Sequence, residues 1–287
     1  MDKIFQEPFE GDVNRKPGRR LFLKKLSVLA GGAVAAVVLP DFLAGARAGA
    51  DLVPAEDPGL QSGFIAYPGA TGEIKAYLSG PRGAEKTPGV VVVHENRGLN
   101  PHIRDVARRL AREGFLALAP DALSPLGGTP DDSNAAVELI KKLDPGRTLG
   151  NFIAAVKYLD ATPRTAGRVG VVGFCWGGAM ANQLAVHCPE LDAAVPYYGR
   201  RPDLADVPKI KASLLLHYAG RDDRINQDVP DYEKALKAAG VDYRIYFYEG
   251  AQHAFNNDAN PDRYNREAAE LAWGRTIAFL RDKLKKT

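Results

Sequence analysis

The sequence predicts an α/β fold in which a mainly parallel sheet of about eight strands is covered by helices on both faces. Two observations carry this prediction. Short apolar runs rich in β-branched and aromatic residues alternate with segments of helical periodicity over most of the chain. The loops after four of these runs hold unusual polar residues, as expected where ligand sites lie at the carboxyl ends of parallel strands.

The elements follow one another in a regular order. Strands are predicted at residues 63–67, 73–79, 89–94, 115–119, 168–173, 193–198, 213–218 and 243–248, and helices at 103–112, 134–143, 149–159, 176–187, 232–239 and 263–284. Only a short glycine-containing turn joins the first two strands, which predicts antiparallel pairing because a crossover helix does not fit. We assign residues 62–287 to a single α/β domain and residues 49–61 to an irregular arm.

Residues 1–48 have the layout of a twin-arginine secretory leader. Arg19 and Arg20 precede an apolar stretch over residues 26–39, and Ala46-Arg47-Ala48 forms a small-x-small cleavage signal. The stretch is shorter than the roughly 20 residues that span a bilayer. We therefore expect a periplasmic or secreted protein with the twin-arginine export machinery as a partner. The alternative is an uncleaved leader that anchors the protein in the membrane.

The leader also accounts for the basic character of the chain. It carries eight Lys/Arg and five Asp/Glu, which is the whole formal net charge of +3, and the remaining chain holds 30 residues of each sign. Because no basic patch with interleaved aromatic residues stands out, we expect no nucleic acid partner.

The segment Gly173-Phe174-Cys175-Trp176-Gly177 follows an apolar strand and opens a helix. A strand, a Gly-x-nucleophile-x-Gly turn and a helix together form the nucleophile elbow of the α/β-hydrolase fold. Cys175 is therefore the predicted nucleophile, and the helix N terminus favours its thiolate. Cys188 lies a helix length away, about 20 Å, so we expect both thiols to be free.

His253 is the predicted general base, because it follows the last strand and completes the chain order nucleophile, acid, histidine. Asp222 directly follows the Gly220-Arg221 turn and is favoured over Asp223 as the acid that orients the imidazole. The other histidines have simpler interpretations: His94 and His187 lie at element ends, His217 lies in a strand core, and His102 opens a helix expected to be exposed.

A metal site is not expected. His94-Glu95 begins like a metalloprotease motif, but the fifth position is Gly98 rather than histidine. Since no other closely spaced pair of His or Cys ligands exists in the sequence, we expect neither a metal nor a cofactor.

Taken together, these motifs resemble those of the dienelactone hydrolase family (carboxymethylenebutenolidases) over nearly all of residues 62–284. The resemblance rests on His94-Glu95, the elbow, Tyr197-Tyr198-Gly199, Gly220-Arg-Asp222 and His253-Ala-Phe255, in this order and spacing. The segment His94-Glu-Asn-Arg-Gly98, combined with the leader, resembles an exported subgroup of that family.

The resemblance implies a Cys175–His253–Asp222 triad and an oxyanion hole made by the backbone N–H groups of Asn96 and Trp176. It also implies that Glu95 contacts the Cys175 thiol and restrains the resting enzyme until substrate displaces it. The residues themselves also allow a buried Glu95 paired with Arg97 or another cation. The predicted substrate-binding residues are Arg97, Tyr198 and Asn257.

Two positions depart from the family. The loop after Asp121 reads Ala-Leu-Ser-Pro-Leu-Gly-Gly, with no arginine where the family has one. The family has a carboxylate-binding arginine four residues after the catalytic histidine, where this sequence has Asn257; Arg97, Arg200 and Arg221 are candidates to replace it. We expect a hydrolase of small-molecule activated esters or lactones that forms an acyl-cysteine. The alternatives are a peptidase or acyltransferase on the same scaffold, or a non-catalytic protein that binds lactones or senses oxidants through Cys175.

Overall fold

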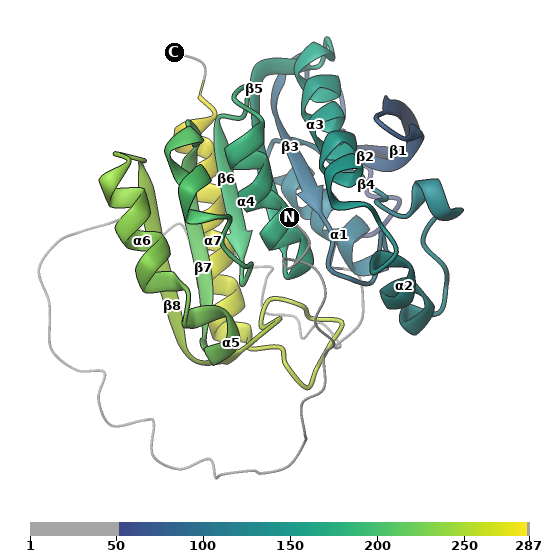
Figure 1. Cartoon of the computed structure of the whole chain (residues 1–287). Coiled ribbons are helices and arrows are strands. Elements are labelled where there is room, and N and C mark those ends of the chain that lie inside the picture. The colour runs from purple at the N-terminus through teal and green to yellow at the C-terminus, as the bar shows by residue number, and fades with distance from the viewer. Residues whose placement is uncertain (1–51, 286–287) are drawn as a thin grey trace, which may run out of the picture.

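The computed structural model describes residues 52–285, which form one eight-stranded sheet with helices on both faces (Figure 1). The strand order is β1-β2-β4-β3-β5-β6-β7-β8. The first two pairs, β1·β2 and β2·β4, are antiparallel, and every other pair is parallel. The predicted fold class and the antiparallel start are therefore confirmed.

All eight predicted strands are present. They are β1 (Leu60–Gly69), β2 (Gly72–Pro81), β3 (Thr87–Val93), β4 (Leu116–Pro120), β5 (Thr165–Phe174), β6 (Ala193–Tyr197), β7 (Ser213–Arg221) and β8 (Tyr243–Gln252). The main helices are α1 (Pro101–Arg112), α2 (Ser133–Ile140), α3 (Pro145–Ala161), α4 (Trp176–His187), α6 (Val229–Ala238) and α7 (Arg266–Lys283). Three short helical segments were not predicted: η1 (Ser124–Leu126), η2 (Leu204–Lys209) and α5 (Asp223–Asn226). They are too short to show a helical period in the sequence.

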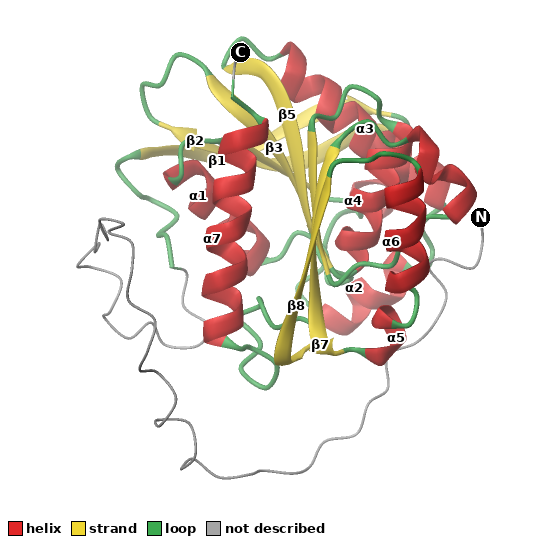
Figure 2. Cartoon of the chain, turned by 90° about the vertical axis from the view of Figure 1, so that its left-hand side faces the viewer, coloured by secondary structure: helices red, strands yellow, loops and turns green. Residues whose placement is uncertain are grey.

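The helices form two layers. Figure 2, which looks along the sheet, shows α1 and α7 on one face and α2 to α6 on the other. Each layer buries its own apolar cluster. One cluster includes Ile103 and Leu280, and the other includes Phe152, Met180 and Tyr232. The central strands are buried on both faces, which explains their nearly continuous apolar runs.

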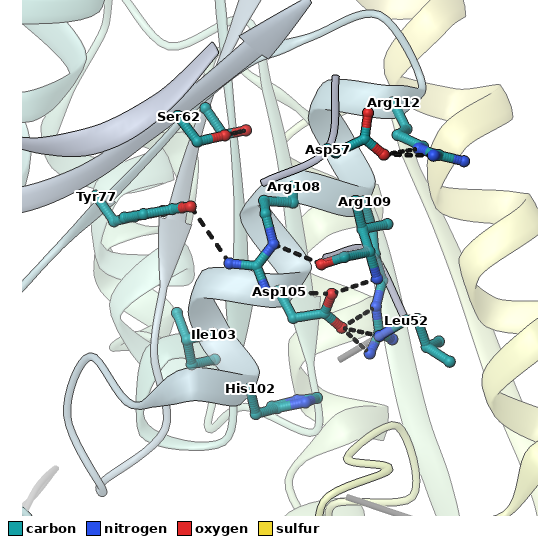
Figure 3. Close-up of polar contacts among 12 residues, drawn as sticks. Leu52, Asp57, Ser62, Tyr77, His102, Ile103, Asp105, Arg108, Arg109 and Arg112 are labelled. Atoms are coloured by element: carbon teal, nitrogen blue, oxygen red, sulfur yellow. Dashed lines mark hydrogen bonds and ion pairs between the residues drawn. The ribbon is translucent and has the colours of Figure 1, made fainter. Parts of the chain in front are cut away.

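The segment before β1 is fastened to α1 (Figure 3). Asp105 accepts hydrogen bonds from the backbone N–H of Val53 (2.8 Å) and of Leu52 (3.3 Å). In return, Arg108 Nε donates to the carbonyl oxygen of Val53 (2.6 Å). Regular structure starts at Leu60, two residues before the predicted start of the domain at residue 62, so in the described chain the irregular arm ends at residue 59.

The predicted leader, residues 1–48, lies outside the described residues. Within residues 52–285, no helix is long and apolar enough to cross a membrane.

Candidate active site

Cys175 occupies the sharp turn between β5 and α4 with φ 56° and ψ −113°, a left-handed conformation that is rare for a non-glycine residue. The turn requires glycine on both sides. A Cβ on Gly177 would lie 2.3 Å from the carbonyl oxygen of Val93 and 2.5 Å from that of His94, and one on Gly173 would lie 2.0 Å from the carbonyl oxygen of Gly177. These neighbours are backbone atoms, which cannot move aside as a flexible side chain can. The structure thus has the predicted elbow, and both cysteines are free.

His253 and Asp222 meet at the same edge of the sheet. His253 follows β8 and Asp222 follows β7, and the distance from His253 Nδ1 to Asp222 Oδ2 is 2.5 Å. Both residues are buried. Since a carboxylate only accepts hydrogen bonds, Nδ1 carries the proton and donates it to Asp222. Nε2 is then left for the Cys175 thiol, whose interaction with His253 raises the pKa of the imidazole.

The charge around His253 favours an imidazolium. Burial of the ring lowers its pKa, but the negative charge of a Cys175 thiolate and the hydrogen bonds to Asp222 and Cys175 outweigh this effect and raise the pKa to about 9. A histidine that gains a proton as the neighbouring thiol loses one forms a thiolate–imidazolium pair. That pair is the nucleophilic state of a cysteine hydrolase.

Glu95 follows β3 and is buried, with 5% of its surface exposed. Its Oε2 accepts a hydrogen bond of 2.6 Å from Nδ2 of Asn257. The orientation of the Asn257 amide is fixed from its other end, because Oδ1 accepts a hydrogen bond from the N–H of Ala259 (3.0 Å). Arg97 is exposed and forms no ion pair with Glu95, so the alternative of a Glu95–Arg97 pair is wrong.

Tyr198 completes the wall of the site. It lies after β6 with φ 39°, and its buried ring packs against His253 with centroids 4.8 Å apart. Burial, followed by the negative charges of Glu95 and Cys175, raises the pKa of the phenol far above its usual value. Both acidic side chains therefore act on the Tyr198 phenol, and they leave neighbouring strands because β3 and β5 pair in register at Val93 and Gly173.

The loop that contains Asn96 is held against the start of α4. The ring of His94 stacks on the ring of Trp176 with centroids 5.4 Å apart. His94 Nε2 accepts a hydrogen bond from the N–H of Ala122 (3.1 Å), so Nδ1 carries the proton and faces the carbonyl oxygen of Glu95 at 2.5 Å. His94 is therefore structural, and the backbones of Asn96 and Trp176 lie in neighbouring segments.

A second set of hydrogen bonds, made by Thr129, also holds this loop and was not predicted from the sequence. Thr129 Oγ1 donates to Asp121 Oδ1 and accepts from the N–H of Leu99, both over 2.8 Å. Gly98 fits beneath this hydroxyl with φ 73°, and a Cβ there would lie 2.2 Å from Thr129 Oγ1. Neither Thr129 nor Asp121 belongs to a recognisable motif, so their role becomes visible only when the two loops are brought together.

The prediction for His102 is wrong. His102 is buried rather than on an exposed helix face, and its Nδ1 lies 2.9 Å from Oδ1 of Asp258. Arg109, two turns further along α1, donates to Asp258 Oδ2 over 2.5 Å and to Asp105 Oδ2 over 2.6 Å. Helix α1 therefore holds the loop that contains Asn257. The spacing of His102, Asp105 and Arg109 on one helical face was a signal of this polar stripe.

The remaining histidine and cysteine predictions agree with the structure. His217 is fully buried in β7 between Thr276 and Tyr248, to which its two ring nitrogens are hydrogen bonded. Cys188 is buried at the end of α4, where burial raises the pKa of its thiol to about 11. Over residues 52–285, no group of three or more His, Cys, Asp or Glu side chains is arranged to hold a metal ion.

A nucleophile at a strand-to-helix elbow, followed in sequence and in space by an acid and a histidine at the carboxyl edge of the sheet, defines the α/β-hydrolase class. Comparison with known proteins identifies the family within this class. The model of the dienelactone hydrolase family matches residues 74–284, and the chain belongs to this family. It is a hydrolase of the carboxylic ester type.

Individual relatives agree with this assignment. A protein of Saccharolobus solfataricus, named as a candidate carboxymethylenebutenolidase, is 33% identical over 76% of this chain and 97% of its own length. A protein of Escherichia coli K12 with the same name is 31% identical over 80% of this chain and 90% of its own length. The crystal structure of a candidate dienelactone hydrolase from Klebsiella pneumoniae is 32% identical, covers 76% of this chain and 97% of its own, and superimposes with a TM-score of 0.69.

Proposed function

We propose that the protein hydrolyses activated esters or lactones through a covalent acyl-cysteine at Cys175, with His253 as the proton carrier and Asp222 as the residue that orients it. The observation that carries this proposal is the continuous set of contacts from Cys175 to His253 to Asp222. The raised pKa of His253 supports it further, since the imidazolium matches a thiolate nucleophile.

In the acylation step, the Cys175 thiolate attacks the carbonyl carbon and forms a carbon–sulfur bond. The oxyanion that results accepts hydrogen bonds from the backbone N–H groups of Asn96 and Trp176. Collapse of this intermediate breaks the bond to the leaving oxygen, which takes the proton from Nε2 of His253. In a lactone the leaving oxygen stays tethered to the acyl group, so the ring opens without loss of a fragment.

In the deacylation step, neutral His253 accepts a proton from water as the water oxygen attacks the thioester. Collapse of the second intermediate breaks the carbon–sulfur bond, releases the carboxylic acid and restores the thiolate–imidazolium pair. Asp222 keeps the proton on Nδ1 through both steps, so that Nε2 always faces the reacting atoms.

Glu95 has a restraining role in this proposal. Its position after β3, which pairs in register with the strand that precedes Cys175, supports a resting state in which the carboxylate faces the thiol, and so does the hydrogen bond from Asn257 that holds it. Entry of substrate would separate them.

The test is a comparison of purified wild type with Cys175→Ala and Cys175→Ser on p-nitrophenyl acetate. The expected result is loss of turnover in both variants, together with a mass increase of one acetyl group on wild-type Cys175 under rapid acid quench. Unchanged hydrolysis by Cys175→Ala would show that Cys175 is not the nucleophile.

We also propose that the protein is exported through the twin-arginine pathway and acts in the periplasm or outside the cell. The support is the sequence of residues 1–48. Expression of the full chain in a Gram-negative host should place it in the periplasmic fraction, and replacement of both Arg19 and Arg20 by Lys should leave it in the cytoplasm. Recovery of both forms from the same compartment would contradict export by this route.

A further inference from the structure

We propose that this active site selects substrates whose acyl group is uncharged and discriminates against acyl groups that carry a carboxylate. The contact behind the proposal is the one between Glu95 and Asn257, in which a buried carboxylate has a neutral amide as its partner. Because β3 and β5 pair in register at Val93 and Gly173, Glu95 and Cys175 each lie two residues beyond this pair, at the ends of neighbouring strands. The inference rests on the proposed hydrolase function and names the substrate class of that same site.

The first step concerns the charge that Glu95 brings. Its carboxylate is 95% buried, and its hydrogen bond from Asn257 adds no positive charge. In the described part of the chain, no lysine, arginine or histidine forms an ion pair with Glu95. A buried carboxyl group whose partner is a neutral donor brings no positive charge to whatever enters the site.

The second step concerns the other charges at the same place. Three acidic side chains, those of Cys175, Asp222 and Glu95, share the site with one basic side chain, that of His253. Acidic groups therefore outnumber basic ones there. The hydroxyl of Tyr198 adds no charge, because burial raises its pKa far above the usual range.

The third step concerns the arginines that could bring positive charge to the site. Arg97 and Arg221 are exposed and Arg200 is half-buried, and within residues 52–285 none of the three forms an ion pair with Glu95. Arg201 lies 4.0 Å from Asp228. Arg109 contacts the loop that contains Asn257, but it is committed to Asp105 and Asp258. None of these side chains contacts Glu95 or Asn257. A substrate carboxylate beside Cys175 would therefore meet acidic side chains and no cationic partner in a partly desolvated site, which is costly.

The hydrogen bonds of the Asn257 amide show how an asparagine differs from an arginine at this position. Its Oδ1 accepts from the N–H of Ala259 and one N–H of its Nδ2 donates to Glu95, so the side chain can offer an incoming anion at most one further N–H, which carries no net charge. An arginine at the same position would bring a positive charge to Glu95 and would have donors left for a second anion.

The test uses two p-nitrophenyl esters of adipic acid, one with a free distal carboxylate and one with that carboxylate capped as a methyl ester. The two substrates share the leaving group and the chain length, and they differ in one charge. Wild type should show a kcat/KM at least about tenfold higher on the capped ester at pH 7. Because the repelling charge is buried, this ratio should persist in 0.5 M NaCl, where surface electrostatics is largely screened.

Asn257→Arg should lower the ratio about tenfold or more. The matched control is Asn260→Arg, the same substitution three residues further along the same loop at a half-buried position with no contact to Glu95. It should leave the ratio within about twofold of wild type. If Asn257→Arg does not fold, Glu95→Gln removes the same charge without added bulk and should also lower the ratio.

Equal or faster hydrolysis of the anionic ester by wild type would overturn the selectivity, and so would an equal effect of both arginine variants. Failure of the hydrolase proposal looks different, since neither ester would then be turned over. In that case binding of the two esters to Cys175→Ser, measured by titration calorimetry, gives the same comparison: tighter binding of the capped ester supports the inference, and equal or weaker binding contradicts it.

Discussion

Nδ1 of His253 lies 2.5 Å from Oδ2 of Asp222, although the two residues are 31 positions apart and follow different strands. The parallel pairing of β7 with β8 accounts for this contact. Arg221 is in register with Gln252, so the residues that follow them, Asp222 and His253, leave the sheet side by side. The acid and the histidine of the site are therefore positioned by sheet register and need no long-range loop to bring them together.

Asp222→Asn should lower kcat/KM about a hundredfold or more, because the amide no longer fixes the tautomer in which Nε2 faces the thiol. Asp223→Asn is the matched control, since Asp223 is the next residue and is exposed. It should keep activity within about twofold of wild type. The measurement is initial-rate kinetics on p-nitrophenyl acetate, and equal losses in both variants would show that the assignment of the acid is wrong.

The pH profile should report the pKa of His253. Because the imidazolium has to donate its proton to the leaving oxygen, kcat/KM should fall as the pH rises through about 9. Asp222→Asn removes a hydrogen bond and a negative charge that both raise this pKa, so the descending limb should move to lower pH in the variant. A limb at the same pH in both proteins would mean that Asp222 does not control the ionisation of His253.

The same pKa has a consequence for stability. The folded state holds the His253 proton more tightly than the unfolded chain, where the ordinary pKa is 6.5. The stabilisation from this proton is therefore complete below pH 6.5 and is lost as the pH rises toward about 9. Replacing Cys175 by Ser removes the thiolate that raises the pKa, so urea unfolding of Cys175→Ser should depend less on pH over this range than that of wild type.

The elbow and the positions of Asp222 and His253 could be predicted from the sequence, because each follows a strand in the order that the fold imposes. The partner of Glu95 could not be predicted, since Asn257 is 162 positions away and its side chain is oriented by a turn within its own loop. A resemblance to proteins with arginine at that position predicted a substrate-binding residue there. The structure instead gives the amide a fixed protein partner, which changes the electrostatics of the site.

The burial of His102 was missed for a related reason. Helical periodicity marked Ile103, Val106 and Leu110 as the inward face of α1, and a polar residue beside that stripe was expected to be solvated. The loop after His253 covers this side of the helix and brings Asp258 to it. The packing of residues 253–265 against α1 cannot be predicted from their local sequence, because this loop has no helical or strand periodicity.

Gly177→Ala should destabilise the protein by about 2 to 3 kcal/mol or prevent folding, because the added methyl group meets two backbone carbonyl oxygens that cannot rotate away. Gly274→Ala in α7 is the matched control, since a Cβ there meets nothing within 4 Å. It should stabilise the helix by up to about 1 kcal/mol. Urea unfolding gives both values, and a neutral effect of Gly177→Ala would contradict the close approach of α4 to the end of β3.

The contacts that α1 makes with Asp258 should stabilise the loop that contains Asn257, and their loss should have a defined pH dependence. Burial disfavours the charged form of Asp258, but the contact with His102 and the charge of Arg109 outweigh it and lower the pKa below the ordinary 3.8. The depressed pKa means that the stabilisation is present above pH 3.8 and is lost as the pH falls below that value.

Asp258→Asn should therefore lower the free energy of unfolding at pH 7 by about 1 to 3 kcal/mol, the range for hydrogen bonds to charged groups. The difference from wild type should shrink as the pH falls below 3.8. Asp262→Asn is the control, because Asp262 lies in the same loop and is exposed. Since Asp258 is the neighbour of Asn257, the variant should also speed amide hydrogen exchange over residues 253–260. A constant stability difference from pH 7 down to pH 3 would show that the charge of Asp258 is not what holds this loop to α1.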